Sequence, residues 1–571
     1  MLMEIGAAAA AAAVLWPRAA ARLALSRAKH PSLAGHARMS RWMASQVARY
    51  DFDADTFFTS DGAPADVATA RRNGLSRLGS EFRLRSPETI AATETLAGSV
   101  SDLQFTRAYR VPFPYARYLS RHLTLGALLT RSEGGRVIDQ DGHAAFDLSG
   151  SYGVNLFGYD VYKDCIDEGA AAVRELGPVL GAYHPAILEI AERLRAVSGL
   201  DEVSFHMSGT EAVMQAVRLA RYHTGRSHIV RFCGSYHGWW DDVQPGVGTP
   251  RRVDGVYTLR DMHERSLHVL RTRRDIACVL VNPLQALHPN QGAPTDNALV
   301  AGRTAAAADR EAYAAWLRQL REVCTARGIV LIFDEVFLGF RLARGGAQEY
   351  FGVKADLVTY GKTLGGGLPV GVVCGRHDLM RRFRDDRPVD ICFARGTFNT
   401  HPYVLGAMRA FLRRLDDPRW VASYDGLEAT WTERASALNA RLAERDLPVR
   451  VAHLVSVWTV AFPAPSRYNW MFQFYLRAEG LALSWVGSGR FIFSHACTDA
   501  EFEDVAERFI RAAHRMLADG WWWCPPGASS ADVQRTVLRE MLAARFGRAG
   551  RASGHRAEWG TIGSKRSPRS T

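Results

Sequence analysis

Cysteine is scarce in this chain, and its spacing is uninformative for metal or disulfide chemistry. There are eight cysteines among 571 residues, with no Cys-x-x-Cys pair and no zinc-site spacing. Disulfide frameworks stabilise small secreted domains, which this long chain does not resemble. We therefore expect reduced thiols, a cytoplasmic protein and no metal site.

Long apolar runs are also missing. The apolar segment at residues 5–16 is too short to span a bilayer. A signal peptide would carry positive charge before it, and Glu4 stands there instead. The Ala- and Arg-rich stretch that follows has a distant similarity to an organelle transit peptide. We favour a surface helix or a start-site artefact, with membrane contact as the less favoured alternative.

Acidic residues are nearly absent from both ends of the chain. Residues 5–50 hold no acid, and residues 543–571 hold one, Glu558, against seven basic groups. The first segment also has seven basic groups: Arg18, Arg22, Arg27, Lys29, Arg38, Arg41 and Arg49. Of the net charge of +12, these ends carry +7 and +6, which leaves the rest near −1. A near-neutral body argues against nucleic-acid binding. Basic ends are typical of solvated tails, and an acidic carrier protein or an anionic membrane is the alternative partner.

Internal repeats are absent as well, and the length exceeds what one hydrophobic core supports, so we expect several domains. The composition and patterning predict six segments. They are a basic extension (1–50), an N-terminal helical region (51–130), the N-terminal part of a small domain (131–180), a large domain (181–405), the C-terminal part of the small domain (406–524) and a basic, partly disordered tail (525–571).

Helical and strand patterns alternate through the large domain, which predicts a mostly parallel α/β sheet. Short apolar runs predict strands at 203–209, 228–233, 276–283, 329–336 and 355–361. Helices are expected at 182–198, 211–223 and 309–327, and a hairpin at 134–150. Shorter strands at 455–462 and 490–496 indicate a smaller α/β domain.

Lys362 is the most informative residue. It lies in the glycine-rich stretch TYGKTLGGGLPVG, 28 positions after Asp334, which ends an apolar strand. This pair suits pyridoxal phosphate, because a lysine amine forms a Schiff base with its aldehyde and an aspartate keeps its pyridinium nitrogen protonated. The alternative for Asp334 is a buried carboxylate bonded to backbone amides.

Two loops offer sites for the phosphate and the ring. Ser208, Gly209 and Thr210 lie between a strand and a helix, where free backbone N–H groups bind anions. Tyr236 follows another strand and could stack on a flat ring, with His237 supporting it. A plain helix cap and a packed aromatic loop are the simpler interpretations.

Three further residues complete the candidate set. Val336 points to the same side of its strand as Asp334 and could pack on the opposite ring face. Thr397 follows a second glycine and could contact the phosphate, and Gln285 could donate to the phenolic oxygen. All these residues lie at the ends of successive strands or in loops, where open α/β sheets bind ligands.

Together the motifs are similar to class III aminotransferases of fold type I. They are SGTEAVMQAVRLAR (208–221), SYHG (235–238), FDEVFLGFR (333–341), YGKTLGGGLPVG (360–371) and GTFNTHPY (396–403). The resemblance is strongest to the glutamate-1-semialdehyde 2,1-aminomutase branch and to aminotransferase modules of polyketide and peptide synthases, and covers about residues 110–520. It implies a large pyridoxal phosphate-binding domain with a mostly parallel sheet, a smaller α/β domain and a homodimer with shared sites.

The resemblance also implies a role for each matching residue. Lys362, Asp334 and Tyr236 would be catalytic: the Schiff-base lysine and proton shuttle, the pyridine-nitrogen ligand and the ring-stacking aromatic. The remaining cofactor contacts would be Ser208, Gly209, Thr210, His237, Gln285, Val336 and, toward the neighbouring subunit's phosphate, Thr397. Tyr152 would line the substrate pocket, and Arg490 could contact a substrate anion or be structural.

Asn282 departs from the family pattern, because many members have a glutamate there that pairs with a carboxylate-binding arginine. This weakens the case for an ordinary glutamate-dependent transaminase. We expect amino transfer from a donor to an aldehyde or ketone, free or carrier-bound, in specialised metabolism. The alternatives are the aminomutase and, more remotely, a non-catalytic carrier-binding scaffold. No Gly-x-Gly-x-x-Gly follows the first strand, which excludes a Rossmann dehydrogenase.

Overall fold

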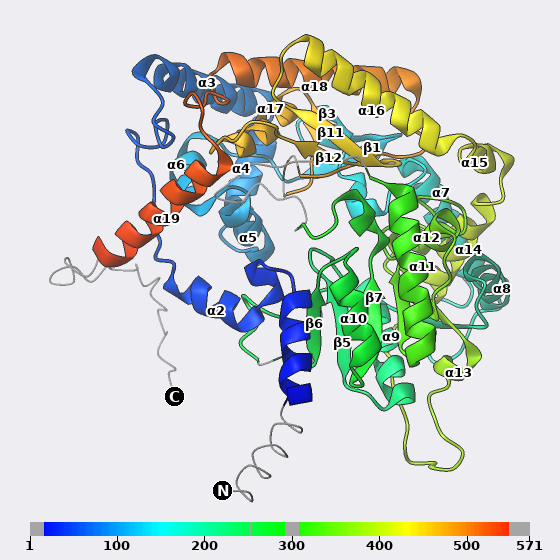
Figure 1. The fold of residues 1–571 in the computed structure, drawn as a ribbon. Coiled ribbons are helices and arrows are strands. Elements are labelled where there is room, and N and C mark those ends of the chain that lie inside the picture. Colours follow the sequence, from blue (N-terminus) through cyan, green and yellow to red (C-terminus); the bar gives the residue numbers. More distant parts are fainter. Residues whose placement is uncertain (1–15, 252, 292–307, 486, 488, 548–571) are drawn as a thin grey trace, which may run out of the picture.

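A seven-stranded sheet forms the centre of the molecule (Figure 1). The computed structural model describes residues 16–251, 253–291, 308–485, 487 and 489–547. The strand order is β4-β10-β9-β8-β7-β5-β6, and β10 alone runs against the other six. The strands are β4 (Glu202–His206), β5 (His228–Phe232), β6 (Val256–Leu259), β7 (Ile276–Val281), β8 (Val330–Asp334), β9 (Leu357–Gly361) and β10 (Gly371–Gly375).

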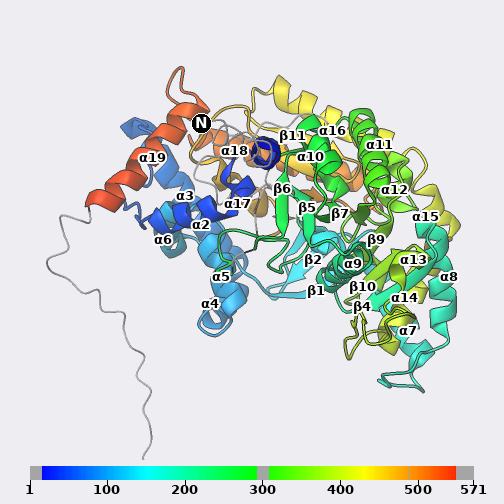
Figure 2. The same cartoon turned by 60° about the horizontal axis from the view of Figure 1, so that its bottom comes forward.

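The central strands are apolar because helices cover both faces of the sheet. Strands β7, β8 and β9 are buried along their whole length, as expected for a parallel sheet between helical layers. In β8, Leu331 packs in the cluster that contains Leu317 of α11, whereas Ile332 packs in the one that contains Val213 of α9. Figure 2 shows α10 and α11 on one side of the sheet and α9 on the other.

Two smaller sheets lie at the other end of the molecule (Figure 1). One has the order β1-β2-β3-β13 and the other β11-β12-β14. Strand β13 pairs in parallel with β3, so the predicted hairpin at 134–150 joins a strand from the C-terminal region. The strands are β1 (Leu129–Glu133), β2 (Arg136–Asp139), β3 (Ala144–Asp147), β11 (Arg450–Leu454), β12 (Val457–Ala461), β13 (Leu481–Ala482) and β14 (Phe491–Ile492).

Helices make up most of the remaining described chain, and none of those described is long and apolar enough to cross a membrane. The helices before β8 are α2 (Ala37–Gln46), α3 (Ala65–Arg85), α4 (Pro87–Leu96), α5 (Ser101–Tyr109), α6 (Phe113–His122), α7 (Tyr159–Val173), α8 (Ala186–Ser198), α9 (Gly209–Thr224), α10 (Glu264–Thr272) and α11 (Arg310–Arg327). Those after it are α12 (Gly346–Phe351), α13 (His377–Met380), α14 (Pro402–Arg414), α15 (Pro418–Ala422), α16 (Leu427–Glu444), α17 (Phe472–Ala478), α18 (Asp499–Ala518) and α19 (Ser530–Gly547).

The predicted mostly parallel α/β sheet is confirmed, and the differences concern its edges. Strands β6 and β10 had no clear sequence signal. Residues 16–28 are helical, and Lys29 then forms an antiparallel bridge with Leu259 of β6. The extension is therefore attached to the sheet edge.

The predicted disorder of the tail concerns residues 548–571, which lie outside the described residues. The six-segment division stays a prediction.

A buried arginine connects the N-terminal helical region to the C-terminal part of the chain. Arg71 of α3 has no exposed surface. Its guanidinium donates to both carboxylate oxygens of Asp61 at 2.9 and 2.7 Å, and to the carbonyls of Phe58 at 2.7 Å and Gly520 at 2.9 Å. Every one of these acceptors would lose a partner if the guanidinium were removed.

We expect Arg71→Leu to lower the free energy of unfolding by about 3–5 kcal/mol, because Asp61 would remain buried without its cation. The urea unfolding midpoint, followed by fluorescence, measures this. Arg121→Leu, at an exposed position on α6, is the matched control and should change stability by less than about 0.5 kcal/mol. Equal midpoints for the two variants would show that Arg71 does not stabilise this junction.

Candidate active site

The carboxyl edge of the central sheet holds a cavity of about 520 Å³. The loops that follow β4, β5, β7, β8 and β9 all reach this edge, where open α/β sheets bind ligands. The cavity is lined by Val154, Met207, Ser208, Gly209, Thr210, Val213, Tyr236, His237, Gly238, Trp239, Asn282, Asp334, Val336, Phe337, Lys362, Gly367, Leu368, Pro369 and Val370.

Asp334 ends β8 at the floor of this cavity and is only 4% exposed. One of its carboxylate oxygens lies 2.8 Å from Nδ1 of His237. The other accepts from the Val336 N–H at 3.2 Å and the Thr359 hydroxyl at 3.3 Å. A buried carboxylate is costly unless it is paired, so these contacts hold Asp334 in place.

His237 is itself buried, and burial lowers its pKa while Asp334 opposes the shift. Its Nε2 has no hydrogen-bond partner among the described residues. Asp334 can accept a hydrogen bond from a neutral imidazole whose proton is on Nδ1. His237 thus orients the aspartate and leaves a polar atom available near the cavity.

Lys362 begins the first turn after β9 with φ +49°, a conformation that lysine rarely adopts. Its Nζ lies 4.6 Å from the centre of the Phe337 ring. Burial lowers the pKa of Lys362 to about 8; Asp334 opposes the shift, and Arg490 and Arg341 reinforce it. The amine is therefore much closer to a nucleophilic, neutral state than a surface lysine at neutral pH.

The start of α9 forms one wall. Ser208 is its N-cap and accepts from the Glu211 N–H at 3.3 Å. The first N–H groups of a helix lack intrahelical partners and attract anions. Glycine is required at 209, since a Cβ there would lie 2.5 Å from Cγ1 of Val336. The helix start and Val336 are thereby brought into direct contact.

Aromatic side chains form the outer part of the cavity. Tyr236 and Trp239 both line it and remain largely exposed. The Asn282 amide donates to the carbonyl of Tyr236 at 3.1 Å and so holds this loop. Sequence reasoning noted Asn282 only as a departure from a pattern, and it missed Trp239 and Phe337 as lining residues.

Two of the predicted cofactor contacts, and both predicted substrate contacts, do not line the cavity. Gln285 is buried, and its amide donates to the carbonyl of Cys233 at 2.6 Å. The short helical turn after β7 directs it into the core, and Asn282 lines the cavity instead. Thr397 is exposed, and its predicted contact with a neighbouring subunit stays a prediction.

The two predicted substrate contacts are near the lysine. Tyr152 is exposed, with φ +57°, and precedes Gly153, where a Cβ would lie 3.5 Å from Cδ of Lys362. Arg490 has its Cζ 5.9 Å from the centre of the Phe337 ring, which Lys362 also contacts. Its Nη2 lies 3.2 Å from Nε2 of His288.

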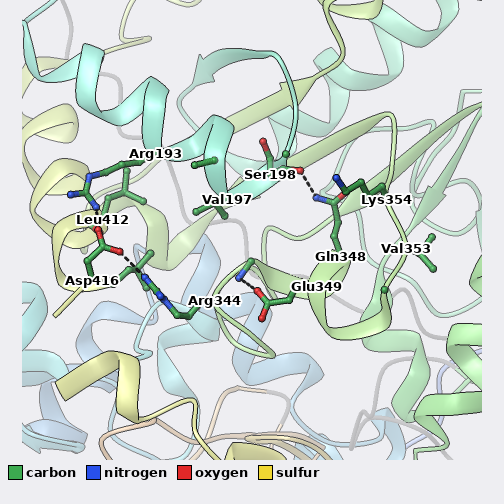
Figure 3. A pocket seen from close by; sticks show the side chains of 15 residues that line it. Arg193, Val197, Ser198, Arg344, Gln348, Glu349, Val353, Lys354, Leu412 and Asp416 are labelled. Atoms are coloured by element: carbon green, nitrogen blue, oxygen red, sulfur yellow. Dashed lines mark hydrogen bonds and ion pairs between the residues drawn. The ribbon is translucent and has the colours of Figure 1, made fainter. Parts of the chain in front are cut away.

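A second hollow, of about 660 Å³, lies at the opposite edge of the sheet (Figure 3). Its residues Gly199 and Lys354 precede β4 and β9 instead of following them. Asp416 accepts hydrogen bonds from Arg193 and Arg344, so its charge is already matched. None of the predicted site residues lines this hollow.

The cavity at the carboxyl edge matches the groups of pyridoxal phosphate. A helix N-terminus suits a phosphate, a buried aspartate suits a protonated ring nitrogen, and an amine of lowered pKa suits an aldehyde. Nε2 of His237 is a buried polar atom without a partner among the described residues, which fits a ligand in the same place. Fold and site together define a pyridoxal phosphate enzyme of fold type I.

Comparison with known proteins identifies the family. Residues 118–513 match Aminotransferase class-III, and the chain belongs to this family. It is 35% identical to a glutamate-1-semialdehyde 2,1-aminomutase of Nitratidesulfovibrio vulgaris strain DP4 over 337 residues, 58% of this chain and 76% of the relative. The corresponding protein of Methanocaldococcus jannaschii is 32% identical over 343 residues, 57% of this chain and 74% of the relative.

Solved structures agree on the fold. A transaminase with bound pyridoxal phosphate is 28% identical, with a TM-score of 0.60, and the match covers 75% of this chain and 98% of that one. A glutamate-1-semialdehyde aminomutase of Pseudomonas aeruginosa PAO1 is 19% identical with a TM-score of 0.63, covering 79% and 99%. The chain is an enzyme of amino-group transfer, and pyridoxal phosphate is its cofactor.

We expect cofactor capture by the cofactor-free protein to follow the titration of Lys362. The rate of forming a borohydride-reducible adduct with pyridoxal phosphate should rise with pH and reach half its maximum near pH 8, because only the neutral amine reacts. Stopped-flow absorbance measures the rate. Lys362→Ala should form no adduct at this site by peptide mapping. A midpoint near the ordinary lysine pKa, or an unchanged adduct in Lys362→Ala, would contradict the assignment.

Proposed function

We propose that this chain is a transaminase of specialised metabolism that moves an amino group from a donor to an aldehyde or ketone through Lys362. The observation that carries this proposal is the common cavity of Lys362 and the Asp334–His237 pair. A lysine of lowered pKa and a buried carboxylate at one edge of a sheet are the two groups that amino transfer requires.

The cofactor, when bound, supplies an aldehyde that links to amines and a ring that accepts electrons from the carbon beside the nitrogen. In this proposal the start of α9 would bind the phosphate, Asp334 would keep a proton on the ring nitrogen, and Tyr236 and Val336 would cover the ring faces. His237 keeps Asp334 oriented through its Nδ1–H.

Lys362 does the proton work in this proposal. Its Nζ would hold the cofactor through the aldehyde, and the same amine would carry the proton that leaves the donor Cα. With a pKa of about 8, roughly a tenth of the amine is neutral at pH 7, which suits a base that must also act as an acid.

Arg490 is the proposed contact for a substrate carboxylate. It lies beside the Phe337 ring that Lys362 also contacts, so an anion on it would be close to the reacting amine. Its Nη2 lies 3.2 Å from Nε2 of His288, and a guanidinium keeps its positive charge beside an imidazole. Tyr152 would line the same side.

A homodimer is the proposed assembly. The segment around Thr397 exposes several apolar side chains, including Val389 at 92%, Phe393 at 66% and Phe398 at 51%. Exposed apolar surface of this kind is typical of an interface with a second copy. A partner there would allow Thr397 to reach the other subunit's phosphate site. We place the enzyme in the cytoplasm, and its eight unpaired cysteines suit that compartment.

The second candidate is the aminomutase, which moves the amine within one molecule. It is favoured by the curated relatives named glutamate-1-semialdehyde 2,1-aminomutase. The same lysine and aspartate would serve both reactions. We prefer the transaminase because this chain has an N-terminal region that a minimal aminomutase lacks. That region is attached to the sheet edge through Lys29 and to the C-terminal part through Arg71.

We expect Asp334→Asn to slow exchange of the donor Cα proton with solvent by at least about 100-fold, because the ring nitrogen would lose its anionic partner. Proton NMR in deuterated buffer with L-alanine and L-glutamate as donors measures the exchange. Glu335→Gln is the matched control. Glu335 is the next residue but does not line the cavity, and its oxygens accept from the N–H groups of Ala347 and Gln348, so its substitution should change the exchange rate of the folded protein by no more than a few-fold. Equal exchange in the Asp334 variant and wild type would remove Asp334 from the mechanism.

Glutamate 1-semialdehyde distinguishes the two candidates. Without any other amino donor, we expect the pure holoenzyme to form little 5-aminolevulinate, because a transaminase needs a separate donor. Product is measured by its colour reaction after condensation to a pyrrole. Exchange of the alanine or glutamate Cα proton in the same preparation shows that it is active. Rapid formation of 5-aminolevulinate would establish the aminomutase instead.

A further inference from the structure

The N-terminal extension lies across the open edge of the central sheet. Strand β6 is the outermost strand on that side, and Lys29 forms an antiparallel bridge with its Leu259. The N–H of Arg260 donates to the carbonyl of Ala28 at 3.1 Å. An edge strand with free hydrogen-bonding groups is commonly covered in this way. The extension is thus a built part of the fold, with its outer face available.

A hollow of about 1010 Å³ lies between the extension and residues 253–258. Basic side chains and one indole line its extension side: Lys29, His36, Arg38, Arg41 and Trp42. The opposite wall includes Tyr257 and Thr258, and Asp254 is the acid among the lining residues. The charged lining residues are therefore three cations, Lys29, Arg38 and Arg41, against one acid, and aromatic rings lie on both sides.

The positive charge of the extension is not matched within the described part of the chain. Arg49 forms an ion pair with Asp51. The other basic residues of the extension form no ion pair with a described acid: Arg18, Arg22, Arg27, Lys29, Arg38 and Arg41. Arginines of the body such as Arg413, which pairs with Glu189, have acids close by, whereas residues 5–50 supply no acid of their own. The uncompensated charge creates a positive potential at this edge.

Large apolar side chains are exposed on the same segment. Trp16 is 75% exposed and Trp42 is 56% exposed, with Leu33 and Met39 also exposed. Tryptophan, methionine and arginine are enriched at protein interfaces, where they act as anchors. A surface with charge alone would suit any counter-ion, whereas this combination suits a partner with both acidic and apolar groups.

The other end of the chain reaches the same region. Arg545 of α19 donates to the carbonyl of Gln46, at the end of α2, at 3.0 Å. Figures 1 and 2 both show α19 close to α2. Arg545, the first basic group of the C-terminal basic segment, is thereby brought to the N-terminal extension.

We propose that this surface, the basic edge formed by residues 16–46 and the hollow beside β6, binds an acidic segment of a partner protein. Aspartate and glutamate side chains of the partner would enter the hollow between Arg38, Arg41 and Lys29, and its apolar residues would pack on Trp42. The hollow favours a protruding segment of a protein over a lipid surface, which is flat. The proposal does not depend on the reaction that the enzyme catalyses.

The test compares two variants of equal net charge. One is Arg18→Gln/Arg22→Gln/Arg27→Gln/Arg38→Gln in the extension. The control is Arg121→Gln/Arg174→Gln/Arg195→Gln/Arg318→Gln, at exposed body positions without described ion pairs. The probe is a fluorescent poly-glutamate peptide of about 20 residues, measured by anisotropy at low and physiological salt. We expect at least a ~10-fold weaker Kd for the extension variant and a change within ~2-fold for the control.

Trp42→Ala provides a second test that leaves the charge unchanged. Here the probe is the same peptide with leucine at every fourth position, and we expect at least a ~3-fold loss of affinity. If the quadruple variant fails to fold, the affinity of Trp42→Ala for this peptide tests the proposed binding surface on its own. Equal losses in the two quadruple variants would overturn the proposal, because net charge alone would explain them. Extension-dependent binding of phosphatidylserine vesicles or of a DNA duplex, without peptide binding, would overturn it as well.

Discussion

The buried carboxylate of Asp334 is the constraint on which the active site depends. At the end of a fully apolar strand, it is stable only because His237, Val336 and Thr359 each donate or offer a hydrogen bond to it. These contacts bring together β8, β9 and the loop after β5. The same carboxylate opposes the effect of burial on Lys362, so one charge both organises the floor of the cavity and keeps the lysine pKa from falling further.

Close backbone approach is the second requirement. Gly209 allows the start of α9 to contact Val336, and Gly371 allows β10 to pass beside Ser208, where a Cβ would lie 1.9 Å from the carbonyl oxygen. The start of α9 and the residues that follow β8 are therefore in direct contact. Lys362, with its positive φ, completes the arrangement at a strained position.

Much of the fold and site could be predicted from the sequence, because the relevant signals are local. The apolar runs of β7, β8 and β9 indicate buried parallel strands, and the positions of Ser208, Tyr236, Asp334 and Lys362 at strand ends predict one shared crevice. Gln285 does not line the cavity, since the turn after β7 directs its amide to the carbonyl of Cys233, and its contact with the cofactor stays a prediction. Strand β10 was missed, because a short antiparallel strand has no helix before it to mark it.

The sequence by itself determined the chemistry: an amine, an acid, a helix start and an aromatic, each at a strand end, as well as the excess of charge at both ends of the chain. Only the tertiary structure decided which neighbours these groups have. It paired Asp334 with His237, put Phe337 beside both Lys362 and Arg490, and brought α19 to the extension at the edge of β6. The physical reason is that such contacts join residues far apart in the chain, and sequence spacing carries no information about them.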